Sequence, residues 1–185
     1  MFVAIELPVS TLDALERAIA PLRDAAPELS WSGPHNRHVT LKFLGDVEPE
    51  RTDGLTAMID GVGRSHRPFS VHLSQIGAFP NFRRARVIWL GVEPEPRLEL
   101  LQHDLEVGAA GLGYEVEGRP FRPHATLARV RTALEIEPIR RLARAARRID
   151  FTAAVDVVEL TLFESTLAPS GARYRRMHAA TLGGR

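Results

Sequence analysis

The tetrapeptide HVTL at residues 38–41 returns as HATL at residues 124–127. Imidazole accepts or donates a proton near neutral pH, so two histidines can divide the work of general base and general acid. Two threonine hydroxyls can donate hydrogen bonds to the non-bridging oxygens of a phosphate. The paired motifs therefore predict displacement at phosphorus by water or by a hydroxyl group, without a nucleophilic side chain or a metal ion.

Both motifs are predicted to lie on β-strands, where residues i and i+2 share a face. His38, Thr40 and Lys42 are then expected to face a cleft, and His124 and Thr126 to face it from a second strand. The opposite face, directed at the helices, is expected to carry Val39, Leu41 and Phe43 in the first motif and Ala125 and Leu127 in the second.

The elements around the motifs alternate between apolar strands and helices with apolar residues at helical spacing. Strands are predicted at residues 2–7, 38–44, 69–79, 86–92, 123–130, 151–163 and 173–180. Helices are predicted after Ser10, after Pro49, around Leu98–Leu112 and after Thr132. A strand and a helix thus precede each motif, and a helix and a strand follow it.

This order indicates an internal duplication, because the motifs lie 86 residues apart and the opening strands lie 84 apart. We expect an α+β fold with two antiparallel-type sheets that face a central cleft and helices on the outer faces. Residues 1–185 are expected to form a single bilobal domain with lobes at about 1–83 and 84–185, in which terminal strands can be exchanged.

Composition narrows the classes of function. The 185 residues include no cysteine, which excludes disulfide frameworks, thiolate metal sites and a cysteine nucleophile. The net charge is +1, which argues against a protein that coats polyanions but allows local recognition of phosphate. No segment approaches the length of an apolar membrane span, so we expect a cytoplasmic protein without membrane contact. We also expect a monomer.

The residues around both motifs resemble the 2H phosphoesterase superfamily, which is defined by two His-x-Thr motifs. FVAIELP, HVTLKFLGDV, IGAFPNFRRARVIWLGV, RPFRPHATLARV and LFESTLAPSGARY are similar to the bacterial RNA 2′,3′-cyclic phosphodiesterases, also called 2′-5′ RNA ligases. The resemblance covers nearly the whole chain.

This resemblance implies a metal-independent enzyme that needs no cofactor and opens a terminal 2′,3′-cyclic phosphate of RNA to a 2′-phosphate. It implies that His38 is the general acid and His124 the general base, and that Thr40 and Thr126 bind the phosphate. Some members of the family also join or split tRNA halves, so tRNA fragments are candidate partners.

Arg129 is a further candidate for binding phosphate, because the family has arginine five residues after the second histidine and a guanidinium suits phosphate. Simple alternation, however, puts Arg129 on the Leu127 face, away from the cleft. Either the strand twists or bulges there, or Arg129 has a structural role. The spacing of His35 and His38 alone is weak evidence for a metal site. Phe79 and Phe82 can stack on a base or pack in the structure. Arg140, Arg144, Arg147 and Arg148 can form a solvated helix face or contact the body of an RNA.

Three alternatives to the hydrolase remain open at this stage. A 2′-5′ RNA ligase uses the same chemistry with a ribose hydroxyl in place of water. A hydrolase of small cyclic nucleotides needs the same pair of histidines. A non-catalytic module that binds RNA ends is disfavoured, because binding alone does not require two titratable groups.

Overall fold

The computed structural model describes residues 1–132, 135–168 and 171–184, which form an α+β fold as predicted. The strands are β1 (Phe2–Glu6), β2 (Ser30–Trp31), β3 (His38–Phe43), β4 (Phe69–Phe79), β5 (Val87–Val92), β6 (His124–Arg129), β7 (Thr152–Val157), β8 (Glu159–Ala168) and β9 (Gly171–Thr181). The α-helices are α1 (Val9–Ala25), α2 (Thr52–Ser65), α3 (Pro96–Gly111) and α4 (Ile136–Ala146), and short 3₁₀ turns lie at η1 (Pro34–Asn36), η2 (Pro49–Arg51) and η3 (Phe82–Arg84).

Within the described residues, these nine strands form one antiparallel sheet in the order β7-β4-β5-β6-β3-β1-β8-β9, with β2 beside β6. The sequence predicted two antiparallel-type sheets that face a central cleft. The structure corrects this point, because Val39 of β3 pairs with Ala125 of β6 and joins the two halves. Pairing of the two motif strands satisfies backbone groups that two separate sheets would leave at exposed edges.

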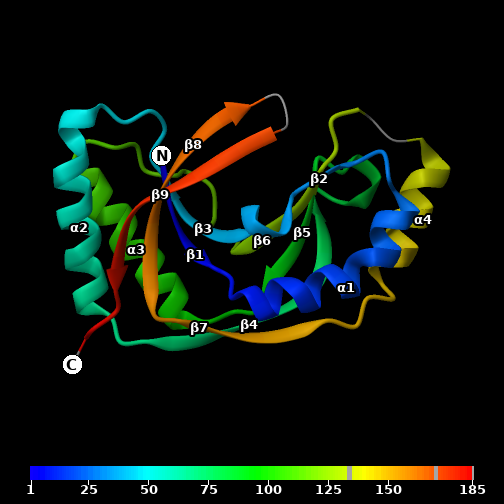
Figure 1. Cartoon of the computed structure of the whole chain (residues 1–185), viewed down its shortest axis with the longest axis horizontal. Helices are drawn as coiled ribbons and strands as arrows, with labels where there is room; N and C mark the ends of the chain where they lie inside the picture. The colour runs from blue at the N-terminus through cyan, green and yellow to red at the C-terminus, as the bar shows by residue number, and fades with distance from the viewer. Residues whose placement is uncertain (133–134, 169–170, 185) are drawn as a thin grey trace.

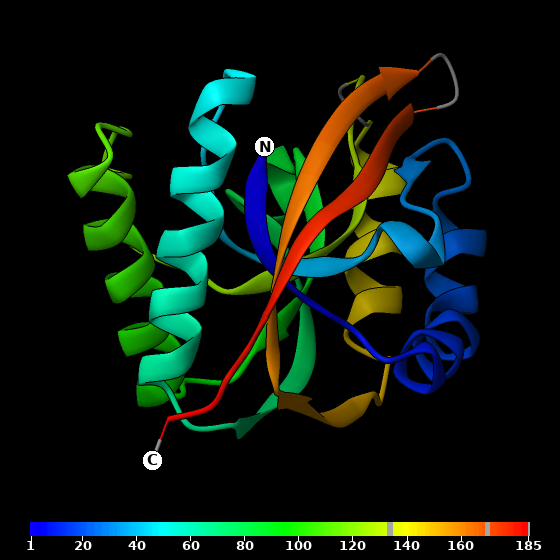
Figure 2. The same ribbon diagram turned by 60° about the vertical axis from the view of Figure 1, so that its left-hand side comes forward.

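Each half of the sheet takes strands from both ends of the chain. β4 pairs with β5 and β7, while β1 pairs with β3 and β8, and β8 also pairs with β9. The stretch predicted as one strand over residues 151–163 is two strands, since β7 lies beside β4 and β8 lies beside β1. At Val158 the chain passes from one half of the sheet to the other (Figure 2).

The four helices cover one face of the sheet (Figure 1). α2 packs against α3, β8 and β9, α3 contacts β3, and α1 packs against α4. One large apolar core results, to which the helices contribute mainly leucines, including Leu15, Leu22, Leu55, Leu98, Leu101, Leu105 and Leu142. The opposite face of the sheet, which we call the open face, carries the candidate site.

In the part of the chain that the structure describes, no helix combines the length and apolar character that a membrane crossing requires.

Candidate active site

Both motif strands contain a β-bulge immediately after the His-x-Thr sequence. In β3, Thr40 pairs with Ala4 and Lys42 with Val3, so Leu41 is the extra residue. In β6, Thr126 pairs with Trp89 and Ala128 with Ile88, so Leu127 is the extra residue. The two strands share one burial pattern along their six residues. A bulge reverses the alternation of faces beyond it.

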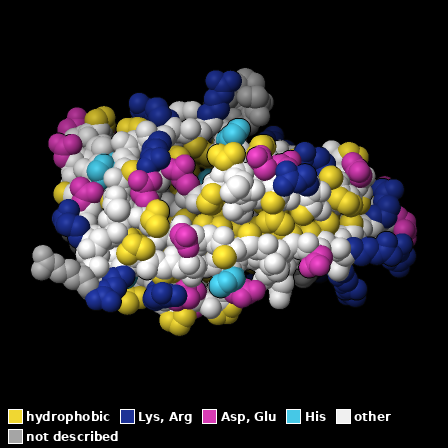
Figure 3. Space-filling model, turned by 60° about the horizontal axis from the view of Figure 1, so that its bottom comes forward, with side chains coloured by type: hydrophobic (Ala, Val, Ile, Leu, Met, Phe, Trp, Pro, Cys, Tyr) yellow, Lys and Arg dark blue, Asp and Glu magenta, His cyan; other side chains and the backbone are white. Residues whose placement is uncertain are grey.

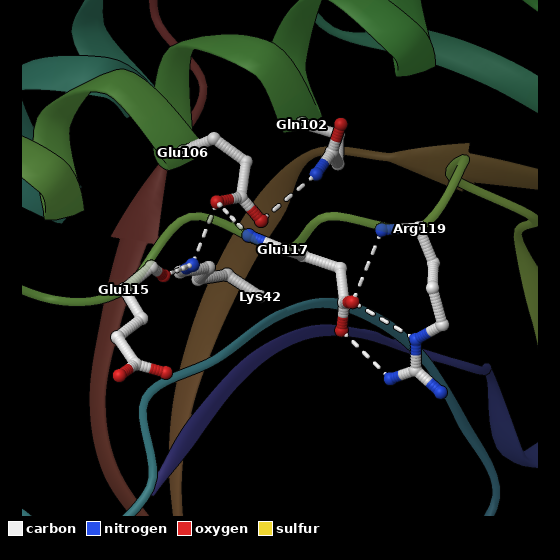
Figure 4. Close-up of polar contacts among 6 residues, drawn as sticks. All are labelled: Lys42, Gln102, Glu106, Glu115, Glu117 and Arg119. Carbon is white, nitrogen blue, oxygen red and sulfur yellow. Dashed lines mark hydrogen bonds and ion pairs between the residues drawn. The ribbon is translucent and has the colours of Figure 1, made fainter.

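The bulge at Leu41 corrects two predicted orientations. Lys42 does not face the site but is buried on the helix side, and Phe43 lies on the open face with 66% of its surface exposed. Lys42 Nζ contacts Glu106 Oε2 of α3 at 2.6 Å and donates to the backbone oxygen of Glu115 at 2.5 Å (Figure 4). Gln102 and the amide of Glu117 also donate to the Glu106 carboxylate. Lys42 thus fixes β3 to α3.

His38 lies on the open face among aromatic rings. Its ring stacks on Phe2 at a centroid distance of 4.7 Å, meets Tyr174 edge-on at 5.1 Å and lies 5.8 Å from Phe163. Phe163 and Tyr174 belong to the β8–β9 hairpin, and Asn36, just before the motif, donates to the backbone oxygen of Ala172 in that hairpin. The C-terminal hairpin therefore builds the surroundings of a histidine near the N-terminus.

His124 also packs against aromatic rings. The ring of Phe79 meets it edge-on at 4.9 Å, and Phe79 contacts Trp89 at 5.1 Å. Trp89 lies across Gly77, where a Cβ atom would stand 2.2 Å from the indole. Phe79 thus packs against Trp89 and His124, while stacking of Phe79 on a base stays a prediction. The aromatic contacts of His38 were not predicted from the sequence. Alternation along the strand that begins at Phe2 could have indicated one of them, the contact between Phe2 and His38.

Each histidine is held by the backbone two residues before it. The Nδ1 atom of His124 lies 2.7 Å from the carbonyl oxygen of Arg122. Because a carbonyl carries no proton, Nδ1 must donate, and Nε2 remains available to exchange a proton. A hydrogen bond with the backbone of Asn36 acts on His38 in the same way.

The surroundings favour the neutral form of both histidines. Burial, and then the positive charges of His124 and Arg129, lower the pKa of His38 to about 4, although the bond to Asn36 opposes this shift. Burial and the charge of Arg129 also lower the pKa of His124, against the bond to Arg122. A bound phosphate anion would raise both pKa values, because nearby negative charge stabilises imidazolium.

Arg129 lies on the open face, contrary to the alternation that the sequence suggested. The bulge at Leu127 turns it back, so Arg129 pairs with Val87 on the same side as Thr126 and Trp89. Its guanidinium is close enough to both histidines to lower their pKa values. The strand therefore bulges here, and the binding of phosphate by Arg129 stays a prediction.

The hydroxyl-bearing residues accompany the histidines on the open face. Thr40 and Thr126 are both half-buried, two residues beyond His38 and His124. Each precedes its bulge, so each keeps the face of its histidine. The site thus combines two imidazoles, two hydroxyls and one guanidinium, a set that can bind a phosphate and transfer protons on two sides of it.

A cavity of about 420 Å³ adjoins His124 on the side away from His38. Phe79, Trp89 and Phe121 form its apolar walls, and Glu93, Glu95 and Glu99 give it acidic ones. Among residues 1–132, 135–168 and 171–184, no group of three or more His, Asp or Glu side chains has the arrangement of a metal site.

Comparison with known proteins identifies the class of phosphoesterase to which this fold and site belong. A family model described as the 2'-5' RNA ligase superfamily matches residues 11–167. The chain belongs to this superfamily, whose members are 2H phosphoesterases, and it is an enzyme of that class.

Relatives cover nearly the full length of the chain. An RNA 2',3'-cyclic phosphodiesterase from Methanothermobacter thermautotrophicus is 30% identical over 98% of this chain and 97% of its own length. A crystal structure of TT0787 from Thermus thermophilus superposes with a TM-score of 0.82 at 28% identity, over 99% of this chain and 97% of the other. E. coli LigT complexed with 3'-AMP gives 0.78 at 29% identity, over 98% and 96% of the two chains.

Proposed function

We propose that this phosphoesterase hydrolyses the terminal 2′,3′-cyclic phosphate of RNA and leaves a 2′-phosphate, and that it works in the cytoplasm. One observation carries the proposal most directly. Two histidines from duplicated strands lie on the open face with the backbone holding one ring nitrogen of each, as general acid–base groups require. The relatives named RNA 2',3'-cyclic phosphodiesterase support the substrate class.

In the proposed reaction, water attacks the cyclic phosphorus on the side of His124, whose Nε2 accepts the water proton. A P–O bond forms to the water oxygen while the bond from phosphorus to O3′ breaks. Protonated His38 gives its proton to the departing O3′. Thr40, Thr126 and Arg129 donate hydrogen bonds to the non-bridging oxygens, where negative charge accumulates.

The substrate itself prepares His38 for this role. In the free protein the low pKa leaves His38 almost entirely neutral at pH 7. The phosphodiester anion raises the pKa of both histidines, so binding of the substrate increases the fraction with a protonated acid.

The test is an oligoribonucleotide that ends in a 2′,3′-cyclic phosphate, with a 3′-phosphate oligonucleotide as the control substrate. We expect a product that comigrates with an authentic 2′-phosphate standard and resists a 3′-specific phosphatase, with the same rate after chelation. A dominant 3′-phosphate product would reverse the roles of the histidines, and no product at all would refute the proposal.

Ligation is the second candidate, favoured by the family to which the chain belongs. Adding an RNA with a free 5′-hydroxyl end to the same assay offers a ribose hydroxyl in place of water. A joined 2′-5′ product in excess over the hydrolysed one would assign the protein to ligation through the same residues, with tRNA halves as the candidate substrates.

A further inference from the structure

Arginine is concentrated in two segments that lie beyond the candidate site. Residues 81–86 and 131–150 contain nine arginines and three acidic residues. These 26 residues therefore have a net charge of +6, whereas the whole chain has +1, so the remainder is −5. We call the surface formed by the described residues of these two segments, which include η3 and α4, the basic end.

The arginines of the basic end are available to a ligand. All nine are exposed. Among the residues that the structure describes, Arg140 forms an ion pair with Glu137 and the other eight form none. Lys and Arg side chains gather at the same end of the molecule in Figure 3, which is the end that carries α4 in Figure 1. A cluster of like charges of this kind produces a positive potential that attracts anions.

A hollow lies between η3 and α4. Its volume is about 380 Å³, and Arg83, Arg84 and Arg86 line it together with Pro80, Val130 and Ile139. Guanidinium groups arranged around a concave surface can donate several charge-assisted hydrogen bonds to one phosphate. The hollow also has apolar residues in its lining, Ala85 among them, so it combines an apolar surface with three guanidinium groups that can bind a phosphate.

Two strands of the candidate site lead to residues that line the hollow. Phe79, which contacts His124, is followed directly by Pro80 of the hollow. On the other strand Arg129 of the site is followed by Val130, whose amide donates to the backbone oxygen of Arg86 at 2.9 Å. The hollow therefore begins at the residues that directly follow Phe79 and Arg129 of the site.

We infer that the basic end binds the phosphate backbone of the RNA on the 5′ side of the reacting nucleotide. This inference rests on the proposed function, because a cyclic phosphate occupies the 3′ end and the rest of such an RNA extends in the 5′ direction alone. Contacts to phosphate carry no base preference, so the surface selects for length of RNA and not for its sequence.

The inference is tested with Arg83→Gln/Arg84→Gln. A matched control, Arg64→Gln/Arg67→Gln, removes two exposed arginines near the C-terminal end of α2, at the other end of the molecule. Binding is measured by fluorescence anisotropy with a labelled single-stranded RNA of about 16 nucleotides that ends in a plain 3′-hydroxyl, a length within the range of single-strand sites. This measurement does not depend on catalysis.

We expect Arg83→Gln/Arg84→Gln, the η3 variant, to bind this RNA about tenfold more weakly. The slope of log K against log salt concentration should also be shallower, by the amount that the loss of about two phosphate contacts gives. It should also lose kcat/KM on a long cyclic-ended RNA, through KM, and keep wild-type kcat/KM on a 2′,3′-cyclic mononucleotide, which cannot reach the hollow. The control variant should match the wild type in each measurement.

Unchanged anisotropy for the η3 variant, or an equal loss for the control variant, would overturn the inference. Binding of vesicles with anionic lipid in place of RNA would also overturn it, in favour of a membrane surface. If the wild type binds RNA through η3 but opens no cyclic phosphate, the proposed function fails and the RNA surface stands, so the two failures are distinguishable.

Discussion

At the scale of residues, the two histidines gain their properties from the rings around them. Phe2 and Tyr174 shield His38 from water, and Phe79 shields His124. Removal from water disfavours imidazolium, which accounts for the lowered pKa values more than the neighbouring charges do. The same packing holds the rings in fixed positions, which general acid–base catalysis requires.

The lowered pKa values predict the pH dependence of turnover. The profile of kcat/KM reports the free enzyme, in which the pKa of His38 is about 4 and that of His124 lies below 6.5. Both limbs of the bell-shaped profile should therefore lie at lower pH than two histidines with the ordinary pKa would give, and the maximum should lie below pH 6.5. The profile of kcat reports the complex, where the phosphate anion raises both pKa values, so its maximum should lie at higher pH. A flat kcat/KM profile, or one with its maximum above pH 7, would contradict this account.

Arg129 should affect both the rate and the pH profile. Arg129→Ala removes a positive charge that lowers both histidine pKa values, so the kcat/KM profile should move to higher pH. Loss of a charge-assisted hydrogen bond to phosphate should reduce kcat/KM by about 10- to 100-fold. Arg129→Lys should keep the position of the profile but recover only part of the rate. An arginine with a purely structural role would change neither quantity in the alanine variant.

The residues that the sequence located correctly are those that precede the bulges. His38, Thr40, His124 and Thr126 share the open face as strand alternation predicts. Beyond each bulge, strict alternation predicts the wrong face for the following residues. The bulge itself cannot be seen in the sequence, because the extra residue leaves the apolar pattern of the strand unchanged. The orientation of Arg129 was consequently left open, and that of Lys42 was predicted wrongly.

At the scale of elements, a buried ion pair anchors the first motif strand. Side chains of Lys42 and Glu106 are 2% and 12% exposed, and they join β3 to α3. Charges in such a place are stable only when each has its partner, because an isolated buried charge loses its hydration without compensation. The contact therefore stabilises the position of β3, and with it His38 and Thr40.

Lys42→Met should lower the free energy of unfolding by about 3 kcal/mol or more, because it leaves the Glu106 carboxylate without its cation. The double variant Lys42→Met/Glu106→Leu should recover much of this loss, since neither side chain then carries an unpaired charge. Urea unfolding at pH 7, followed by two probes, measures both values. If the double variant were less stable than Lys42→Met, the buried charge would not be the cause.

The helices and strands themselves were largely predictable from apolar spacing, as Leu12, Leu15, Ile19 and Leu22 of α1 show. Their ends were less predictable. The helix expected after Thr132 begins at Ile136, and the strand expected over residues 151–163 divides at Val158. An extended chain reads as one strand in sequence even where it changes partners, because pairing depends on distant residues.

At the scale of the whole molecule, the duplicated halves of the chain are interlocked. β4 from the first half pairs with β5 and β7 from the second, and β8 from the second half pairs with β1 from the first. The hairpin of β8 and β9 supplies two of the rings around His38. Each histidine therefore depends on chain segments that lie far from it in sequence.

This interlocking predicts that the two halves do not fold separately. Fragments 1–83 and 84–185 each contain strands whose partners belong to the other fragment, so each exposes unpaired edges and part of the core. Expressed alone, neither should show a cooperative thermal transition by circular dichroism. Coexpressed, the two should copurify and recover the transition. A fragment that unfolds cooperatively by itself would show that the lobes are independent.

The central claim is that His38 and His124 act together on one phosphate. Its most direct test is the turnover of a cyclic-phosphate-ended oligoribonucleotide by His38→Ala and His124→Ala, in protein with wild-type circular dichroism. Loss of a positioned acid or base should reduce kcat by about 10²- to 10⁴-fold in each variant. Near wild-type turnover by either folded variant would contradict the two-histidine site.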